Sequence, residues 1–551
     1  MEDKEKLTAL RNLFARHDIT GFLQPVHDEF MSEYPPACFQ RLAWLSGFTG
    51  SAGALLVLAD RAVLFTDGRY TLQAAAQLDS ALFSVMNSGD MTPEKWLARY
   101  VPEAVVGYDP ALFTSAMVQR MSKLARLAPV PNLVDAIWQD RPAVSATRIF
   151  LHDEKFAGES SKSKCTRLAV TLKEQGADAA FIAAPESVCW LLNIRAHDVE
   201  CTPLALVRAV LYADGTVDLF VDSQRVPPLP SHIHTVYPPP LEKLSGKSVL
   251  CDEAQMPVLL LGALEKAGVY IVRGEDPCTL PKACKNPTQV EAIRRAHLRD
   301  GKAVAKLLAW INNHSDIETI SEMEVAAKLL TFRAEDETFV EPSFPTIAGA
   351  GEHGAIVHYR ADEASNRRLK KGELLLLDSG GQYPDGTTDI TRTIAIGTPS
   401  AEHKDRFTRV LKGHIAVATA TFPKGTRGSQ LDGLARHFLW EVGLDYDHGT
   451  GHGVGQFLGV HEGPQRISKR GGDAVLEVGM VISNEPGYYK NGEYGIRIEN
   501  LVVVVEKENG FLGFDTITRV PLDEKLIDFS MLTAAEKQWL ETYQAWAEQG
   551  A

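Results

Sequence analysis

The sequence predicts an α/β architecture for residues 1–284 and an α+β architecture for residues 285–551. In the first part, short apolar runs alternate with stretches of helical periodicity, which is typical of α/β domains. In the second part, a long helical segment is followed by several strands with few helices between them, which favours an antiparallel sheet packed under helices. We expect a further boundary near residue 147, and therefore three domains at 1–147, 148–284 and 285–551.

The composition is that of a globular, acidic protein. Apolar residues make up 45% of the 551 residues and charged residues 23%, so the chain can bury a large core and extensive disorder is excluded. A net charge of −14 argues against binding to nucleic-acid phosphates or to anionic lipid. The seven cysteines include no C-x-x-C pair, and the first residues contain no apolar signal region. We therefore expect a cytoplasmic protein without nucleic-acid or membrane partners.

The first domain is predicted to open with a helix and to continue as alternating strands and helices. Apolar residues recur at steps of three and four within residues 4–16, which places them on one helical face. Residues 53–70 are predicted to form two strands joined by a turn at Ala59 and Asp60. Further helices are predicted at 71–78, 93–101 and 114–127.

The segment 148–284 repeats this plan. A helix and a strand precede Trp190-Leu191, and two strands then follow around a turn at Asp214 and Gly215. The pair Trp44-Leu45 stands at the corresponding place in the first domain. The pattern is compatible with an internal duplication and equally with two unrelated α/β domains.

The third domain is predicted to begin with a long helix, because Asn286 is suited to cap it and Pro287 to occupy its first turn. Strands are predicted in GELLLLD, TRTIAIG, GMVISNE and IENLVVVV. Helices are predicted near 402–420, 428–442 and 532–548. The third domain is therefore predicted to be the α+β part of the chain.

Two aspartates are predicted to meet across a hairpin in this domain. Four consecutive leucines form a buried strand that ends at Asp378, and Asp389 lies in the returning strand after a Pro-Asp-Gly turn. The spacing of eleven residues places the midpoint between Tyr383 and Pro384, slightly off this turn. We therefore expect a bulge or a longer loop in the hairpin.

The same arrangement recurs later in the chain, where one strand ends at Glu485 and another begins with Glu499. Burying ionised carboxylates is costly unless a cation accompanies them. The first hairpin contains no basic residue before Arg392. The two aspartates therefore require a cation from outside their hairpin.

A segment rich in glycine and histidine, HGTGHGVGQFLGVHEGP, lies between the two acidic pairs. Its glycines permit close backbone approach around His448 and His452, and His461 follows nine residues later. Carboxylates and a neutral imidazole suit divalent ions such as Mn²⁺, Co²⁺ or Zn²⁺. Two such ions would balance the four carboxylates, and a two-metal site can activate a bridging water to hydroxide while polarising a carbonyl. The pattern indicates hydrolytic chemistry.

At these residues the chain resembles the pita-bread metallopeptidases, and specifically the three-domain cytosolic Xaa-Pro aminopeptidases. Resembling blocks span nearly the whole chain and include SGFTGSAGALLV, TDGRYTLQAAAQLD, EPSFPTIAGAGEHGAIVHY, LDSGGQYPDGTTDITRT and NEPGYYKNGEYGIRIEN. The resemblance implies two creatinase-like N-terminal domains followed by a pita-bread catalytic domain. It also implies manganese dependence, with two metal ions, and a homodimer.

The resemblance assigns roles to individual residues. The metal-ligand pattern of the family falls on Asp378, Asp389, His452, Glu485 and Glu499. Its substrate-handling histidines fall on His358, His448 and His461, and its substrate-binding arginine from the N-terminal domain falls on Arg69. In this scheme Glu485 also acts as the general base and His461 donates to the substrate carbonyl or its oxyanion, while His358 contacts the departing proline or the carbonyl region.

The sequence therefore predicts a hydrolase, a dinuclear metal-dependent aminopeptidase that cleaves the N-terminal Xaa-Pro bond of peptides with a metal-bridging hydroxide. One alternative is a prolidase acting on Xaa-Pro dipeptides, although two N-terminal domains favour longer substrates. Another is a non-catalytic pita-bread binding protein. Such proteins typically lack metal ligands, whereas all five positions are present here.

Overall fold

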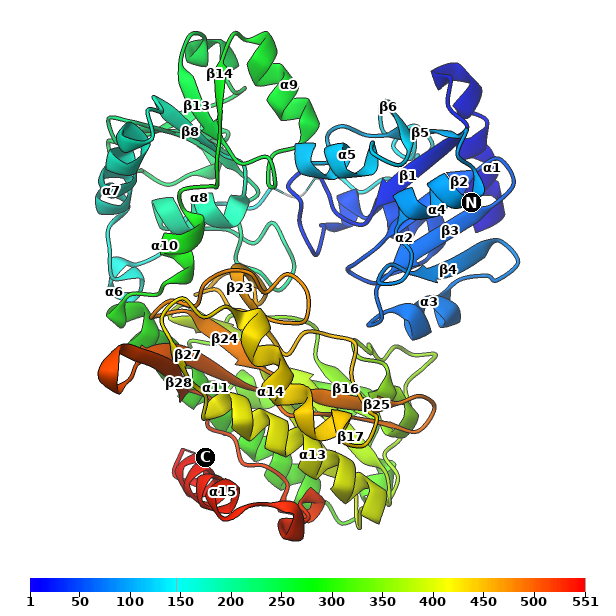
Figure 1. Ribbon diagram of the computed structural model, residues 1–551, viewed down its shortest axis with the longest axis vertical. Coiled ribbons are helices and arrows are strands. Elements are labelled where there is room, and N and C mark those ends of the chain that lie inside the picture. The colour runs from blue at the N-terminus through cyan, green and yellow to red at the C-terminus, as the bar shows by residue number, and fades with distance from the viewer. Residues whose placement is uncertain (145, 551) are drawn as a thin grey trace. The chain divides into compact units, whose positions relative to one another are not determined.

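The computed structural model describes residues 1–144 and 146–550, which form two compact units (Figure 1). Unit 1 comprises Met1–Leu151, Glu159–Glu200 and Leu204–Thr279. Unit 2 comprises His152–Gly158, Cys201–Pro203 and the chain from Leu280 onward. Two short segments from the first half of the chain thus belong to the same unit as the C-terminal half. The two boundaries expected from the sequence, after residues 147 and 284, stay predictions.

Unit 1 contains a first mixed sheet with the strand order β4-β3-β2-β1-β5-β6. Its strands are β1 (Gly21–Pro25), β2 (Ala54–Leu58), β3 (Ala62–Thr66), β4 (Phe83–Asn87), β5 (Val105–Tyr108) and β6 (Arg126–Pro129). The accompanying helices are α1 (Asp3–Arg11), α2 (Arg41–Ser46), α3 (Thr71–Gln77), α4 (Pro93–Tyr100) and α5 (Ser115–Met121). Helix α5 ends earlier than predicted because residues 126–129 form the edge strand β6.

A second mixed sheet in unit 1 has the order β12-β11-β10-β8-β13-β14. Its strands are β8 (Ala179–Ile182), β10 (Arg208–Tyr212), β11 (Val217–Phe220), β12 (Ile233–Val236), β13 (Ser248–Cys251) and β14 (Tyr270–Arg273). Its helices are α7 (Ser161–Glu174), α8 (Pro185–Leu192) and α9 (Val258–Lys266), and β7 (Phe150–Leu151) pairs with β9 (Ile194–Arg195).

The two sheets of unit 1 share one topology. In the first sheet, β1 pairs antiparallel with β2 and parallel with β5. In the second sheet, β8 pairs antiparallel with β10 and parallel with β13. Trp44-Leu45 lies on α2 and Trp190-Leu191 on α8, so each pair occupies the helix that follows the first strand. The common topology favours internal duplication over unrelated α/β patterning.

Unit 2 is built from antiparallel strand pairs and long helices, which confirms the α+β prediction. The strands are β15 (Glu341–Pro342), β16 (Ile347–Ala350), β17 (Leu374–Ser379), β18 (Gly381–Tyr383), β19 (Gly386–Thr387), β20 (Ile390–Ala395), β21 (Thr421–Pro423), β22 (Gly451–Gly453), β23 (Glu462–Ile467), β24 (Val481–Asn484), β25 (Gly487–Lys490), β26 (Tyr494–Arg497), β27 (Asn500–Glu506) and β28 (Phe511–Thr516). The helices are α6 (Glu154–Ala157), α10 (Thr279–Ala283), α11 (Pro287–Asn313), α12 (Glu322–Arg333), α13 (Ala401–Ala418), α14 (Gly428–Trp440) and α15 (Ala534–Glu548).

The long helix α11 starts where the sequence predicts. The Asn286 side chain accepts a hydrogen bond from the backbone N–H of Gln289 at 2.9 Å, and Pro287 occupies the first turn. This cap satisfies one of the free N–H groups at the start of the helix. Helices α13, α14 and α15 also lie within a few residues of their predicted ranges.

The four leucines of β17 join three hydrophobic clusters of unit 2. Leu375 and Leu377 join a cluster with residues of α11 and α12, whereas Leu374 joins a cluster with residues of α13, α14 and α15. Figure 1 shows α13 and α14 running across the strands of unit 2. Because side chains of a strand alternate, Asp378 points to the same side of β17 as Leu374 and Leu376. Strand β17, buried along its whole length, therefore carries a carboxylate at its end.

Candidate metal centre

The two aspartates lie diagonally across a hairpin. Asp378 pairs with Thr391 in the ladder of β17 and β20, and the pairing of Gln382 with Thr387 continues the same register through β18 and β19. The predicted bulge or longer loop is wrong, since a two-residue turn at Pro384-Asp385 closes this register without any insertion. The spacing of eleven residues instead places Asp389 diagonal to Asp378, on the same face of the sheet.

The two glutamates lie opposite each other between two ladders. Strands β24 and β27 pair Asn484 with Asn500, and β25 and β26 pair Gly487 with Arg497 in the same register. Glu485 and Glu499 occupy the gap between these ladders, so the arrangement predicted from the first hairpin does recur.

Thr391 joins the two acidic pairs. Its carbonyl oxygen accepts a hydrogen bond from the backbone N–H of Glu499 at 3.2 Å, and its hydroxyl donates to Glu499 Oε2 at 2.7 Å. Thr391 lies opposite Asp378 in the first hairpin. The four carboxylates thus come from two hairpins that contact each other directly.

His452 on β22 completes the cluster. Its Nε2 lies 3.5 Å from Asp389 Oδ2 and 3.4 Å from Glu485 Oε1. Its Nδ1 hydrogen-bonds the carbonyl of Gly453 at 2.9 Å, which fixes the ring orientation and leaves Nε2 toward the acids. One ligand atom each of Asp389, His452 and Glu499 lie within 4.8 Å of one another. No other group of His, Cys, Asp or Glu side chains in the described part of the chain has this geometry.

The electrostatics of the cluster call for cations. Burial raises the pKa of Asp389, Glu485 and Glu499, and neighbouring carboxylates raise it further. Asp378 Oδ1 and Glu499 Oε1 are buried oxygens for which the described residues supply no hydrogen-bond partner. Buried acceptors of this kind are costly unless something else binds them. Hard oxygen atoms and one imidazole nitrogen therefore fit a pair of divalent cations at this site.

The cation missing from the first hairpin comes from Arg497, which the sequence analysis did not single out. Its Nη2 donates to Asp378 Oδ2 at 2.6 Å, and its Nη1 donates to the Tyr489 hydroxyl at 2.6 Å. Arg497 is the last residue of β26 and stands two residues before Glu499, and this spacing was the available signal. Arg392 instead donates to the carbonyls of Glu499 and Val520 and does not contact the acidic side chains of the cluster.

Two of the predicted histidines lie beside the cluster. His461 is next to His452, and His448 is connected to the cluster through Tyr489. The ring centroid of His461 lies 4.3 Å from that of His452, at an interplanar angle of 76°. His448 Nε2 lies 2.8 Å from the Tyr489 hydroxyl and so connects through Arg497 to Asp378. Burial raises the pKa of Tyr489 to about 12, so its hydroxyl is protonated near neutral pH.

The third histidine, His358, lies in the segment after the 3-10 helix Gly351–Ala355. Both neighbouring residues are anchored: Val357 accepts a hydrogen bond from Arg497 at 3.3 Å, and the Tyr359 hydroxyl donates to buried Glu322 at 2.9 Å. Since Arg497 also binds Asp378, the segment that carries His358 is tied to the acidic cluster.

Behind His461, a buried carboxylate is held by two lysines. Lys282 Nζ donates to Glu462 Oε2 at 2.6 Å, and Lys285 Nζ donates to the other carboxylate oxygen. Glu462 directly follows His461 in the chain. It pairs across β22 and β23 with Gly453, which directly follows His452. This salt-bridge triad anchors the residue that follows His461, and no local pattern in the sequence indicated it.

Arg69 belongs to unit 1. Its guanidinium donates to both carboxylate oxygens of Asp67, at 2.9 and 2.7 Å, and lies 5.2 Å from the ring centroid of Tyr70. Its predicted contact with the substrate stays a prediction.

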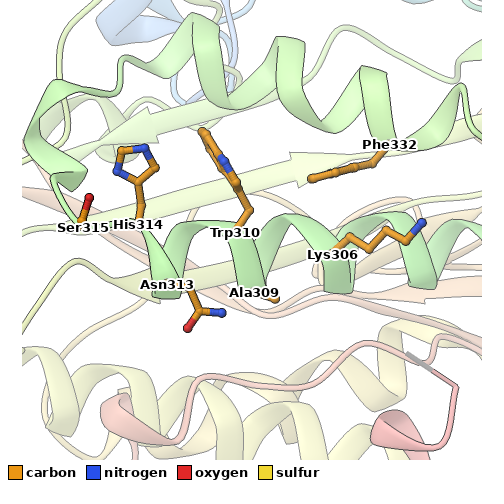
Figure 2. Close-up of a pocket in the computed structure, with 7 residues that line it drawn as sticks. All are labelled: Lys306, Ala309, Trp310, Asn313, His314, Ser315 and Phe332. Carbon is orange, nitrogen blue, oxygen red and sulfur yellow. The ribbon is translucent and has the colours of Figure 1, made fainter.

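A surface pocket of about 500 Å³ lies elsewhere in unit 2 (Figure 2). Its lining comes from α11, α12 and the segment after α11 and consists of Lys306, Ala309, Trp310, Asn313, His314, Ser315 and Phe332. None of the predicted site residues lines it, so this pocket is not part of the acidic cluster.

Within residues 1–144 and 146–550, no helix is long and apolar enough to cross a membrane.

Comparison with known families assigns nearly the whole chain. Residues 291–506 match the metallopeptidase family M24, and residues 510–549 match the C-terminal region of that peptidase. Residues 6–137 and 140–289 each match a creatinase/prolidase N-terminal domain. Two creatinase-like N-terminal domains therefore precede an M24 catalytic domain, as the sequence predicts.

Proteins that are similar over nearly the whole chain are named as aminopeptidases P. A probable Xaa-Pro aminopeptidase P of Laccaria bicolor is 40% identical, with 98% of this chain and 89% of that protein covered. Aminopeptidase P2 of Arabidopsis thaliana is 38% identical, with 98% and 85% covered.

Solved structures of metallopeptidases are also similar to this chain. The X-prolyl aminopeptidase of Caenorhabditis elegans, described as a cytosolic enzyme with a di-nuclear active site, is 33% identical and superposes with a TM-score of 0.93 over 100% of this chain and 96% of that chain. The prolidase of Pyrococcus furiosus is 25% identical, with a TM-score of 0.52 over 64% of this chain and 99% of that chain. The chain belongs to the Xaa-Pro aminopeptidase P family of M24 metallopeptidases.

Proposed function

We propose that this protein is a dinuclear metallopeptidase that removes the N-terminal residue from peptides whose second residue is proline. The observation that carries the proposal is the convergence of four carboxylates and His452 in a chain that matches Xaa-Pro aminopeptidases P over 98% of its length. The P. furiosus prolidase, by contrast, matches only 64% of this chain. A peptidase of longer substrates is therefore favoured over a dipeptidase.

The metal ligands in this proposal are Asp378, Asp389, His452, Glu485 and Glu499. Two divalent ions, which we expect to be Mn²⁺, would supply Lewis acidity: they would polarise a carbonyl oxygen and lower the pKa of water, so that it can lose a proton and attack as hydroxide. Asp378 Oδ1 and Glu499 Oε1 support this assignment, because they are buried oxygens that need a partner.

Glu485 is the general base. Its Oε1 accepts a hydrogen bond from the Ser483 hydroxyl at 3.1 Å, which orients the carboxylate. Glu485 takes a proton from the attacking water and passes it to the leaving proline nitrogen. His461 donates to the substrate carbonyl as negative charge develops on its oxygen, and His358 contacts the departing proline or the carbonyl region.

His448 and Arg69 are assigned to substrate binding. His448 has a fixed orientation, because its two ring nitrogens lie 2.7 Å from the Gly449 carbonyl and 2.8 Å from the Tyr489 hydroxyl. A proline at the second position presents a tertiary amide without an N–H, so the site needs no hydrogen-bond acceptor for that amide.

The protein is further inferred to be cytoplasmic and homodimeric. The similar C. elegans enzyme is described as cytosolic, which supports the cytoplasmic assignment. The dimer is inferred from the family resemblance.

The test compares kcat/KM for Arg-Pro-Pro, Arg-Ala-Pro, N-acetyl-Arg-Pro-Pro and the dipeptide Arg-Pro in the presence of Mn²⁺. The proline ring fills the apolar wall of the pocket, and its fixed φ lowers the entropy lost when the substrate is ordered. The value of kcat/KM should therefore be roughly 30- to 1000-fold higher for the Pro peptide than for the Ala peptide. The acetylated peptide should be cleaved poorly, because acidic residues near the metals receive the free ammonium. Equal rates for the Pro and Ala peptides would refute proline specificity, and a preference for Arg-Pro would reassign the protein as a prolidase.

A further inference from the structure

A buried ion pair lies beside the hairpin that carries the two aspartates. Asp300 on α11 is fully buried and accepts hydrogen bonds from Arg333 on α12, Nε to Oδ1 at 2.7 Å and Nη2 to Oδ2 at 3.0 Å. It also accepts from the Tyr383 hydroxyl and the Thr388 hydroxyl, each at 2.8 Å. Arg333 is 1% exposed, so the whole pair is removed from solvent.

This ion pair contacts the immediate neighbours of both aspartates. Arg333 Nη2 donates to the hydroxyl of Ser379, which follows Asp378, at 3.1 Å. Asp300 binds the hydroxyl of Thr388, which precedes Asp389. One pair of side chains therefore holds the hairpin next to each of the two carboxylates.

The regular backbone ladder of the hairpin is interrupted at this point, between the pairing of Ser379 with Ile390 and that of Gln382 with Thr387. The carbonyl of Gly380 accepts a hydrogen bond from Ser343 instead of from the returning strand, at 3.1 Å. A Cβ at Gly380 would meet the carbonyl oxygen of Thr388 at 1.9 Å, so the backbones can approach this closely only at a glycine. The backbone ladder is interrupted here, and side-chain hydrogen bonds bridge the interruption.

We propose that the Asp300–Arg333 ion pair is a positioning device that sets the separation of the Asp378 and Asp389 carboxylates and thereby the affinity for the metal pair. Neither residue belongs to the ligand set. In the metal-free protein, repulsion between the two carboxylates favours a wider spacing, and the ion pair resists it by holding Ser379 and Thr388. The proposal rests on the proposed metallopeptidase function.

Two variants test the positioning role. Arg333→Lys keeps the charge but cannot form the two-pronged contact with Asp300 together with the bond to Ser379. Thr388→Val keeps the side-chain shape and removes only the hydroxyl, which protects the experiment against a variant that fails to fold. Each is prepared metal-free and titrated with Mn²⁺ in a calorimeter, and its thermal unfolding is followed with and without Mn²⁺.

The expected result is a 10- to 100-fold weaker Mn²⁺ affinity, about the size seen when residues that support metal ligands are changed. The increase in Tm that Mn²⁺ produces should shrink accordingly, and saturating Mn²⁺ should restore most of kcat.

Two matched variants control for loss of stability alone. Arg41→Lys changes another buried arginine, which binds both oxygens of Asp135 in unit 1 at 2.7 and 2.9 Å. Thr408→Val changes another fully buried threonine, whose hydroxyl donates to the Lys404 carbonyl at 2.7 Å. Both should lower the Tm of the metal-free protein and leave the Mn²⁺ affinity unchanged.

The outcomes separate this proposal from the proposed function. Unchanged Mn²⁺ affinity in Arg333→Lys and Thr388→Val, in a protein whose wild type binds Mn²⁺ and cleaves Arg-Pro-Pro, would overturn the positioning role alone. A wild-type protein that binds no Mn²⁺ would overturn both proposals.

Discussion

Arg497 Nη2 donates to Asp378 Oδ2 at 2.6 Å, although the two residues are 119 positions apart in the chain. The same guanidinium binds the Tyr489 hydroxyl and the Val357 carbonyl, so it connects the acidic cluster to the segments that carry His448 and His358. Its side chain is 2% exposed. A buried arginine in this position can orient groups on three sides of the site.

Replacing Arg497 with lysine should lower kcat by about 10- to 100-fold, because an ammonium group cannot reach all three partners in the planar geometry of a guanidinium. The measurement is steady-state kinetics on Arg-Pro-Pro, with bound Mn²⁺ determined by elemental analysis. Wild-type kcat in this variant would show that Arg497 only balances charge.

Asp389→Ala should abolish activity and reduce bound Mn²⁺. The carboxylate of Asp389 is buried beside His452 and helps to balance the charge of the ions. Elemental analysis of the purified variant and its turnover of Arg-Pro-Pro provide the check. Full metal occupancy with normal turnover would remove Asp389 from the site.

His461→Ala should leave the metal content intact while kcat falls by about 10²-fold or more, since a donor to the transition state is lost. The neighbouring triad of Glu462 with Lys282 and Lys285 remains in place in this variant, so the strand should keep its position. A loss confined to KM would instead identify His461 as a residue that binds the substrate in its ground state.

The pH dependence of stability should reveal Lys164. This lysine is 1% exposed, and burial lowers its pKa to about 7, while its Nζ donates to the Trp190 carbonyl and to Asn193 Oδ1 at 2.7 Å each. Between this value and the unfolded pKa of about 10.4, the unfolded chain binds the proton and the folded chain does not. The contribution of Lys164 to stability therefore rises as pH increases through that window and is least favourable below pH 7.

The check compares thermal unfolding of the wild type and Lys164→Met from pH 6 to pH 9.5. The wild type should gain stability relative to the variant as pH rises, by up to about 1.4 kcal/mol for each pH unit. Parallel curves for the two proteins would contradict a lowered pKa in the fold.

Much of the architecture could be predicted because its signals are local in the sequence. The cap of α11 at Asn286, the buried strand of four leucines and the strand that ends before Glu485 all depend on residues within a few positions of one another. The order of acids and histidines along the chain also indicated divalent metal chemistry, and the resemblance then named the family that the comparisons confirm.

Register and charge compensation could not be predicted in this way. The sequence suggested that Asp378 and Asp389 face each other, whereas closure of the turn at Pro384-Asp385 pairs Asp378 with Thr391. A shift of two positions leaves every side chain on its face of the sheet, so the alternation of apolar residues cannot distinguish the two registers.

The residues that support the cluster emerge only when distant segments pack together. Arg333 is 46 positions from Ser379 and 33 from Asp300, and nothing near it in the sequence indicates that it must be buried. A guanidinium on a helix is by default a solvated group, and it becomes part of the site only because α11 and α12 pack against the hairpin. The ligand types were therefore readable from the chain, whereas their spacing and the cations that balance them follow from tertiary packing.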